Sequence, residues 1–139
     1  MIMVTVDRVG LDVDSNQAVL LLKVVEGGTI LPIWIGPIEA SAIAMEMQGI
    51  RAPRPLTCDL LKSVVDSLDA KITMAKVNDL KEDTFFARLV LETGGRTLEV
   101  DSRPSDAVAL AIRAGAPIYV AESVLDRAGI PSAPDNVVH

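Results

Sequence analysis

The stretch DSRPSDAVALAIRAG, from Asp101 to Gly115, changes character halfway along its length. Its first six residues carry two carboxylates, two hydroxyls, a guanidinium and a proline, whereas the last nine are almost all small or aliphatic. Pro104 suits the first position of a helix, because its missing N–H would be unpaired there in any case. Apolar residues then recur at helical spacing, and glycine is a common helix end. The stretch therefore predicts a helix that begins at Pro104, with Arg103 as its cap residue.

Segments with the composition of strands lie on both sides of this helix. Alternating or dense aliphatic runs are separated by short turns rich in Gly, Asn and Asp, which favours hairpin connections. Gly94-Gly95 is a strong hairpin signal, and Asn78 to Asp83 is predicted as the preceding turn. The segments predicted as strands are Met3–Val13, Ala18–Glu26, Thr29–Ile35, Lys71–Val77, Thr84–Glu92, Arg96–Val100 and Pro117–Ala121.

Two further helices are predicted between the third and fourth strands, and a short one follows the last strand. Pro37 opens the first of them, and Gly49 ends it, because glycine readily takes the left-handed conformation that terminates helices. Thr57 is the predicted cap of the second helix, and Ser123 is the predicted cap of the short last one.

The order βββ-α-α-βββ-α-β-α predicts an α+β fold with a mixed, largely antiparallel sheet and three to four helices. A length of 139 residues suits one domain, which we assign to residues 1–130. The segment 131–139 has no periodicity and is predicted to be a flexible C-terminal tail.

The composition is apolar for a protein with no membrane span. Half of the residues are hydrophobic and the mean hydropathy is +0.37, yet no apolar run reaches the ~18 residues that a span needs. We therefore expect no membrane association and predict a homo-oligomer, since exposed apolar patches mark contact sites. Trp34 is assigned to the core or to an interface. One cysteine and an N-terminus unlike a signal peptide predict a cytoplasmic protein.

Several classes of chemistry are excluded by what the chain lacks. His139 is the only histidine, so a Ser-His-Asp or Cys-His site has no base in the body of the chain. HExxH, a Cys/His zinc cluster, a P-loop and GxGxxG are all absent. The four aromatic side chains are too few for a base-stacking platform of the usual kind. The net charge of −6 means that binding to a polyanion would need a local basic patch or a metal ion.

Carboxylates and guanidiniums are the groups that remain for chemistry. They lie at or near the predicted helix starts: Glu39, Asp59, Asp101 and Asp106, with Arg51, Arg54 and Arg103. Carboxylates without imidazole suit Mg²⁺ or Mn²⁺, and arginines and helix N-termini suit phosphate. This set could cleave a phosphodiester. The alternative is structural, because first-turn carboxylates are ordinary partners of the helix dipole, worth about 0.3–1 kcal/mol.

Four segments resemble a known family: LPIWIGPIEASAIAMEMQG (31–49), RPLTCDLL (54–61), FFARLVL (85–91) and DSRPSDAVALAIRAGAPIYVAESVL (101–125). Together they are similar to the bifunctional nuclease domain family, in which bacterial members also occur as stand-alone uncharacterised proteins. The resemblance runs from about Val4 to Ile130. It implies a compact α+β domain, DNase and RNase activity, and a homo-oligomer.

The resemblance also suggests roles for the polar residues. The catalytic candidates are Asp101, Arg103, Ser105, Asp106 and Glu39, the phosphate-binding candidates are Arg51, Arg54 and Arg103, and the candidate ligands of Mg²⁺ or Mn²⁺ are Asp101, Asp106 and Asp59. The expected function is metal-assisted cleavage of DNA or RNA. The alternative is a non-catalytic homo-oligomeric module for a partner protein or a small anionic ligand, in which the polar stretch caps a helix at an interface.

Cys58 is a departure from the family pattern, which usually has histidine at this position. Its place just after a possible cap residue means that the helix N-terminus could lower the pKa of the thiol. The other interpretation is a small buried hydrophobic residue. In an oxygen site for Mg²⁺ a thiolate would be a poor replacement ligand.

Overall fold

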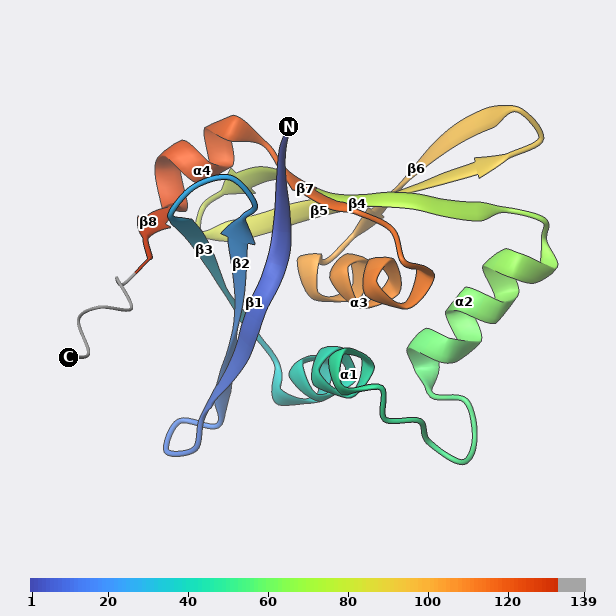
Figure 1. The fold of residues 1–139 in the computed structure, drawn as a ribbon, viewed down its shortest axis with the longest axis horizontal. Helices are drawn as coiled ribbons and strands as arrows, with labels where there is room; N and C mark the ends of the chain where they lie inside the picture. The colour runs from blue at the N-terminus through green and yellow to red at the C-terminus, as the bar shows by residue number, and fades with distance from the viewer. Residues whose placement is uncertain (133–139) are drawn as a thin grey trace.

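A computed structural model describes residues 1–132 of the chain (Figure 1). The elements are β1 (Ile2–Asp12), β2 (Gln17–Val24), β3 (Thr29–Ile35), α1 (Pro37–Gln48), α2 (Thr57–Ser67), β4 (Lys71–Lys81), β5 (Thr84–Thr93), β6 (Arg96–Ser102), α3 (Pro104–Ala114), β7 (Ile118–Val120), α4 (Glu122–Ala128) and β8 (Ile130–Pro131). Within these residues, no helix is both long and apolar enough to cross a membrane.

All eight of these strands join one sheet in the order β6-β5-β4-β7-β1-β2-β3-β8. Only the β4–β7 pair is parallel among them, and every other neighbouring pair is antiparallel. The predicted α+β fold with a mixed, largely antiparallel sheet is therefore confirmed.

Helix α3 lies between the strongly curved sheet and α1 (Figure 1). Three of its seven buried residues are alanines, whose small side chains allow the helix to lie against both β4 and α1. Val108 and Leu110 are almost fully buried. The helix begins at Pro104 after Arg103 and ends before Gly115, whose φ of 69° is in the left-handed region. The central prediction of the sequence is confirmed for this helix.

Among α1, α2 and α3, helix α2 has the fewest buried residues. Val65 is its only buried residue, and it joins a small cluster with Ile72, Leu89 and Leu110. The predicted cap at Thr57 is wrong, because Leu56 holds that position. The Leu56 N–H donates to the Asp59 carboxylate at 2.9 Å. The side chain that satisfies a backbone N–H at this helix start is therefore the first-turn carboxylate and not the Thr57 hydroxyl.

Three other details differ from the sequence predictions. Ala121, not Ser123, precedes α4. β4 continues to Lys81, and only Glu82 and Asp83 form the turn, both with positive φ. The short β8 was not predicted. Its Pro131 pairs with Thr29, and the rest of the predicted tail, from residue 133, lies outside the described residues.

Trp34 is not a core residue. Its side chain is 65% exposed, because it alternates along β3 with the buried Ile33 and the half-buried Ile35. The core part of that assignment is wrong. The interface part, like the cytoplasmic location, remains a prediction.

Candidate functional site

A pocket of about 830 Å³ opens between α1, α2, α3 and the loop 50–56. Its charged lining residues are Glu39, Glu46, Asp59, Asp106, Arg51, Arg103 and Arg113. The N-termini of α1 and α3 contribute Glu39 and Asp106 to it. Four carboxylates face three guanidiniums, so the pocket combines groups of both signs with one carboxylate in excess.

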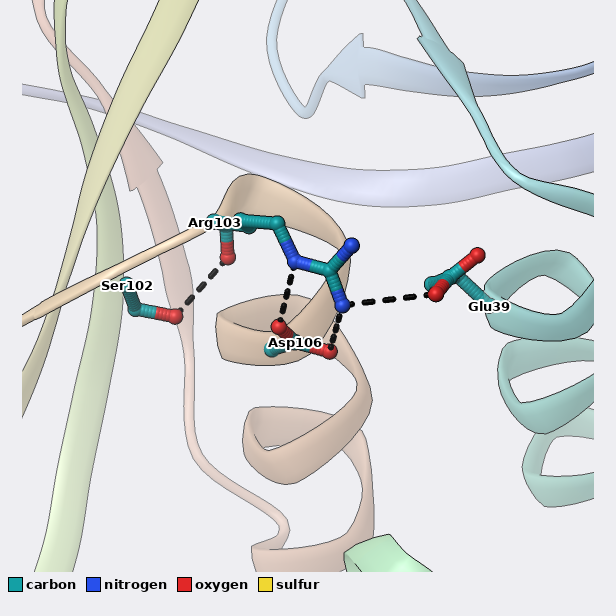
Figure 2. A network of polar contacts seen from close by, with 4 residues as sticks. All are labelled: Glu39, Ser102, Arg103 and Asp106. Atoms are coloured by element: carbon teal, nitrogen blue, oxygen red, sulfur yellow. Dashed lines mark hydrogen bonds and ion pairs between the residues drawn. The ribbon is translucent and has the colours of Figure 1, made fainter.

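Arg103 connects the starts of the two helices (Figure 2). Its Nε donates to Asp106 Oδ2 at 2.9 Å, and its Nη2 donates to Asp106 Oδ1 and to Glu39 Oε2, each at 3.3 Å. Nη1 has no hydrogen-bond partner among residues 1–132 (Figure 2). The hydrogen bond to Asp106 is the main cause that raises the pKa of the guanidinium above its ordinary value. Arg103 is therefore charged, and one of its donor nitrogens has no partner in the part of the chain that the structure describes.

The Glu39 carboxylate lies against Gly36. A Cβ atom at position 36 would meet Glu39 Oε1, which is the end of a flexible side chain that can turn aside. The backbone of Gly36 is extended, with φ −76° and ψ 157°, so any residue can adopt the conformation at this position.

A second arginine, Arg113, also lines the pocket and is more buried than Arg103. Arg113 Nη1 contacts Glu46 Oε2 at 2.8 Å and Asp59 Oδ1 at 2.9 Å. The three side chains are only 19%, 24% and 23% exposed. This ion triplet links α3 to α1 and α2. Sequence reasoning did not identify Glu46 or Arg113 as site residues.

The remaining predicted site residues are spread more widely. The large pocket includes Glu39, Asp59, Arg51, Arg103 and Asp106, but not Asp101, Ser105 or Arg54. Asp101 is exposed on β6, opposite Arg88 of β5. Ser105 is buried and lines a second, smaller pocket.

The carboxylates predicted as metal ligands are not gathered at one point within the described residues. Within residues 1–132, no three or more His, Cys, Asp or Glu side chains lie close enough to hold one together. Asp106 is paired with Arg103, Asp59 is paired with Arg113, and Asp101 lies outside the pocket. The site for Mg²⁺ or Mn²⁺ therefore remains a prediction.

Cys58 lies in the wall of the pocket, half-buried. Burial raises the pKa of its thiol, and the carboxylates of Asp106 and Asp59 raise it further, while Arg113 acts in the opposite direction. The suggestion that the helix start lowers this pKa is wrong, because desolvation is the largest effect.

Alkylation of Cys58 by iodoacetamide should have its pH midpoint above the ~8.5 of a free cysteine, because only the thiolate reacts. An Asp106→Asn variant should move the midpoint to lower pH, because it removes a carboxylate that raises the pKa. Mass spectrometry across pH 7–10 measures both. Urea-unfolded protein is the control, and equal midpoints for folded and unfolded chains would contradict the expected effect of the pocket.

Comparison with known proteins identifies the family. Residues 20–133 match the family model of the bifunctional nuclease domain. An uncharacterised protein of Mycobacterium tuberculosis is 48% identical over 124 residues, covering 88% of this chain and 74% of that relative. Bifunctional nuclease 1 of Arabidopsis thaliana is 30% identical over 105 residues, or 73% of this chain but only 32% of the plant protein. Because the family model matches most of the sequence, the chain belongs to the bifunctional nuclease domain family.

Proposed function

We propose that the chain cleaves phosphodiester bonds of DNA or RNA in the pocket between α1, α2 and α3. The observation that carries this proposal is Arg103, a charged guanidinium held between two carboxylates where two helices begin, with its Nη1 unpaired within residues 1–132. A planar guanidinium and helix N-termini both favour phosphate oxygens. The names of the plant relatives agree with this chemistry for those proteins.

The two carboxylates beside Arg103 suit different tasks. Asp106 accepts from two guanidinium nitrogens and so fixes the orientation of Arg103. Glu39 accepts only from Nη2, at 3.3 Å, so a phosphate oxygen that binds the guanidinium can displace it. The released carboxylate then accepts a proton from water as the water oxygen attacks phosphorus. The bond from phosphorus to the leaving sugar oxygen breaks, and that oxygen takes a proton from solvent.

Cleavage of end-labelled single- and double-stranded DNA and RNA tests the proposal. We expect wild type to cut and Asp106→Asn to lose at least about tenfold in rate, because Asp106 fixes the orientation of Arg103 and loss of a preorganised charged contact commonly costs a factor of this size or more. Asp101→Asn is the matched control, because the same change is made at an exposed residue outside the pocket. Addition of Mg²⁺, Mn²⁺ or EDTA tests the predicted metal requirement.

Two results would reject the proposal as stated. Equal residual cleavage by all three proteins would identify a contaminating nuclease. Loss in Asp101→Asn alone would move the active site to the end of β6, where one of the catalytic candidates predicted from the sequence lies.

A non-catalytic homo-oligomeric module is the second candidate, and one observation favours it. Helix α2 and its C-cap residue present exposed aliphatic side chains at helical spacing: Leu60, Leu61, Val64 and Leu68. Exposed apolar patches of this kind mark contact sites between proteins. The solution mass by light scattering tests this candidate, and a monomer at micromolar concentration would exclude it.

A further inference from the structure

A second pocket, of about 430 Å³, shares Arg103 with the large one. Its walls come from the end of β3, the β4–β5 turn and the start of α3. Its volume lies in the range of small-ligand sites, about 300–1,000 Å³. Since the same guanidinium lines both pockets, a ligand that spans them would pass Arg103.

Trp34 is the exposed aromatic side chain of this second pocket. It is also the only tryptophan in the chain. A single exposed hydrophobic residue needs no explanation by itself. Here, however, the indole lies beside polar groups: Gln17 and Asp83 line the same pocket, as does Ser105, the only buried polar residue among residues 1–132. An aromatic surface with a few polar groups around it is typical of a ligand site.

The chemistry of this lining fits an unpaired nucleobase. A base can stack on the indole, and the Gln17 amide and the Asp83 carboxylate can bind a base that carries an exocyclic amino group. A base inside a duplex is already stacked and paired, so its face is not available to Trp34. One indole is far less than a stacking platform, and it would hold one base rather than follow a strand.

We propose that the Trp34 pocket holds one unpaired base of a single-stranded nucleic acid while Arg103 contacts the adjoining phosphate. This inference rests on the proposed nuclease function and specifies its substrate as single-stranded. Adenine, cytosine and guanine are preferred over thymine and uracil, because the Asp83 carboxylate accepts from an exocyclic amino group that thymine and uracil lack.

The fluorescence of the single tryptophan reports directly on this pocket. We would titrate wild type, in EDTA, with ten-nucleotide dA, dC and dT strands and with a blunt hairpin duplex. Saturable quenching is expected with dA and dC, weaker quenching with dT, and none with the duplex. Polarisation of a labelled dA strand then compares variants. Trp34→Ala should weaken binding by about 5- to 150-fold, as expected for one stacked base, and Trp34→Phe should restore most of the loss.

The outcomes separate this inference from the nuclease proposal. Cleavage without quenching would overturn the base pocket and leave the nuclease proposal standing. Quenching without cleavage would support the pocket as a binding site and overturn the nuclease. Emission that changes with protein concentration but not with any strand would overturn the inference and identify Trp34 as a contact between copies of the chain.

Discussion

An Arg103→Ala variant should cleave nucleic acid at least about 100-fold more slowly than wild type, the usual cost of removing a preorganised group that stabilises transition-state charge. Its stability should hardly change. The Arg103 side chain is 65% exposed, and exposed ion pairs contribute only about 0–1 kcal/mol. Initial rates on a labelled single strand and a urea unfolding curve measure the two effects.

Arg127→Ala is the matched control for this experiment. Arg127 also pairs with a carboxylate at the surface, Asp79 at 3.6 Å, but it lines neither pocket. Arg103→Lys should recover only part of the rate, because lysine keeps the charge but loses the planar fork. Cleavage by Arg103→Ala at the wild-type rate would remove Arg103 from the mechanism.

Local chemistry explains why much of the fold could be predicted from sequence. Pro104 and Gly115 mark the two ends of α3 by their backbone preferences alone, and these preferences do not depend on distant contacts. The cap at Leu56 could not be predicted in this way, because the partner of its N–H is the Asp59 side chain rather than a residue at the cap position itself. β8 is two residues long and exists only because β3 lies beside it.

The candidate site, like the fold, could be predicted only in part from the sequence. Asp101 and Arg103 are two residues apart in sequence, yet Asp101 belongs to β6, opposite Arg88, and lies outside the pocket that Arg103 enters. Closeness along the chain was therefore a poor guide to closeness in space at the boundary between a strand and a helix.

A signal for the missed residues was present in the helices themselves. Glu46 follows Glu39 by seven residues, and Arg113 follows Asp106 by seven. Seven residues are close to two turns, so each pair lies on one face of its helix. These faces of α1 and α3 lie against each other, and two ion pairs join them. Arg103 pairs with Glu39 at the helix starts, and Arg113 pairs with Glu46 about two turns further along. Which helix faces pair depends on the sheet that supports them.

An Arg113→Met variant should lose about 2–3 kcal/mol of unfolding free energy, somewhat less than the 3–5 kcal/mol for breaking a fully buried pair. Methionine fills most of the same volume but leaves Glu46 and Asp59 beside each other without a counter-charge. Both carboxylates are about three-quarters buried, so water compensates them poorly. The urea midpoint should fall by roughly 1 M for a slope of about 1–3 kcal/mol/M.

The controls for Arg113→Met test whether charge or packing is lost. Lys62→Met breaks the pair with Asp66 along α2, and helical pairs of this spacing contribute only about 0.3–0.5 kcal/mol. Adding Glu46→Gln to Arg113→Met should recover part of the stability, because it removes one of the two unpaired carboxylates. An unfolding midpoint like that of wild type would mean that the triplet does not hold α1 and α2 to α3. The expected result gives the two arginines opposite signatures: Arg103 affects rate with little effect on stability, and Arg113 maintains the pocket itself.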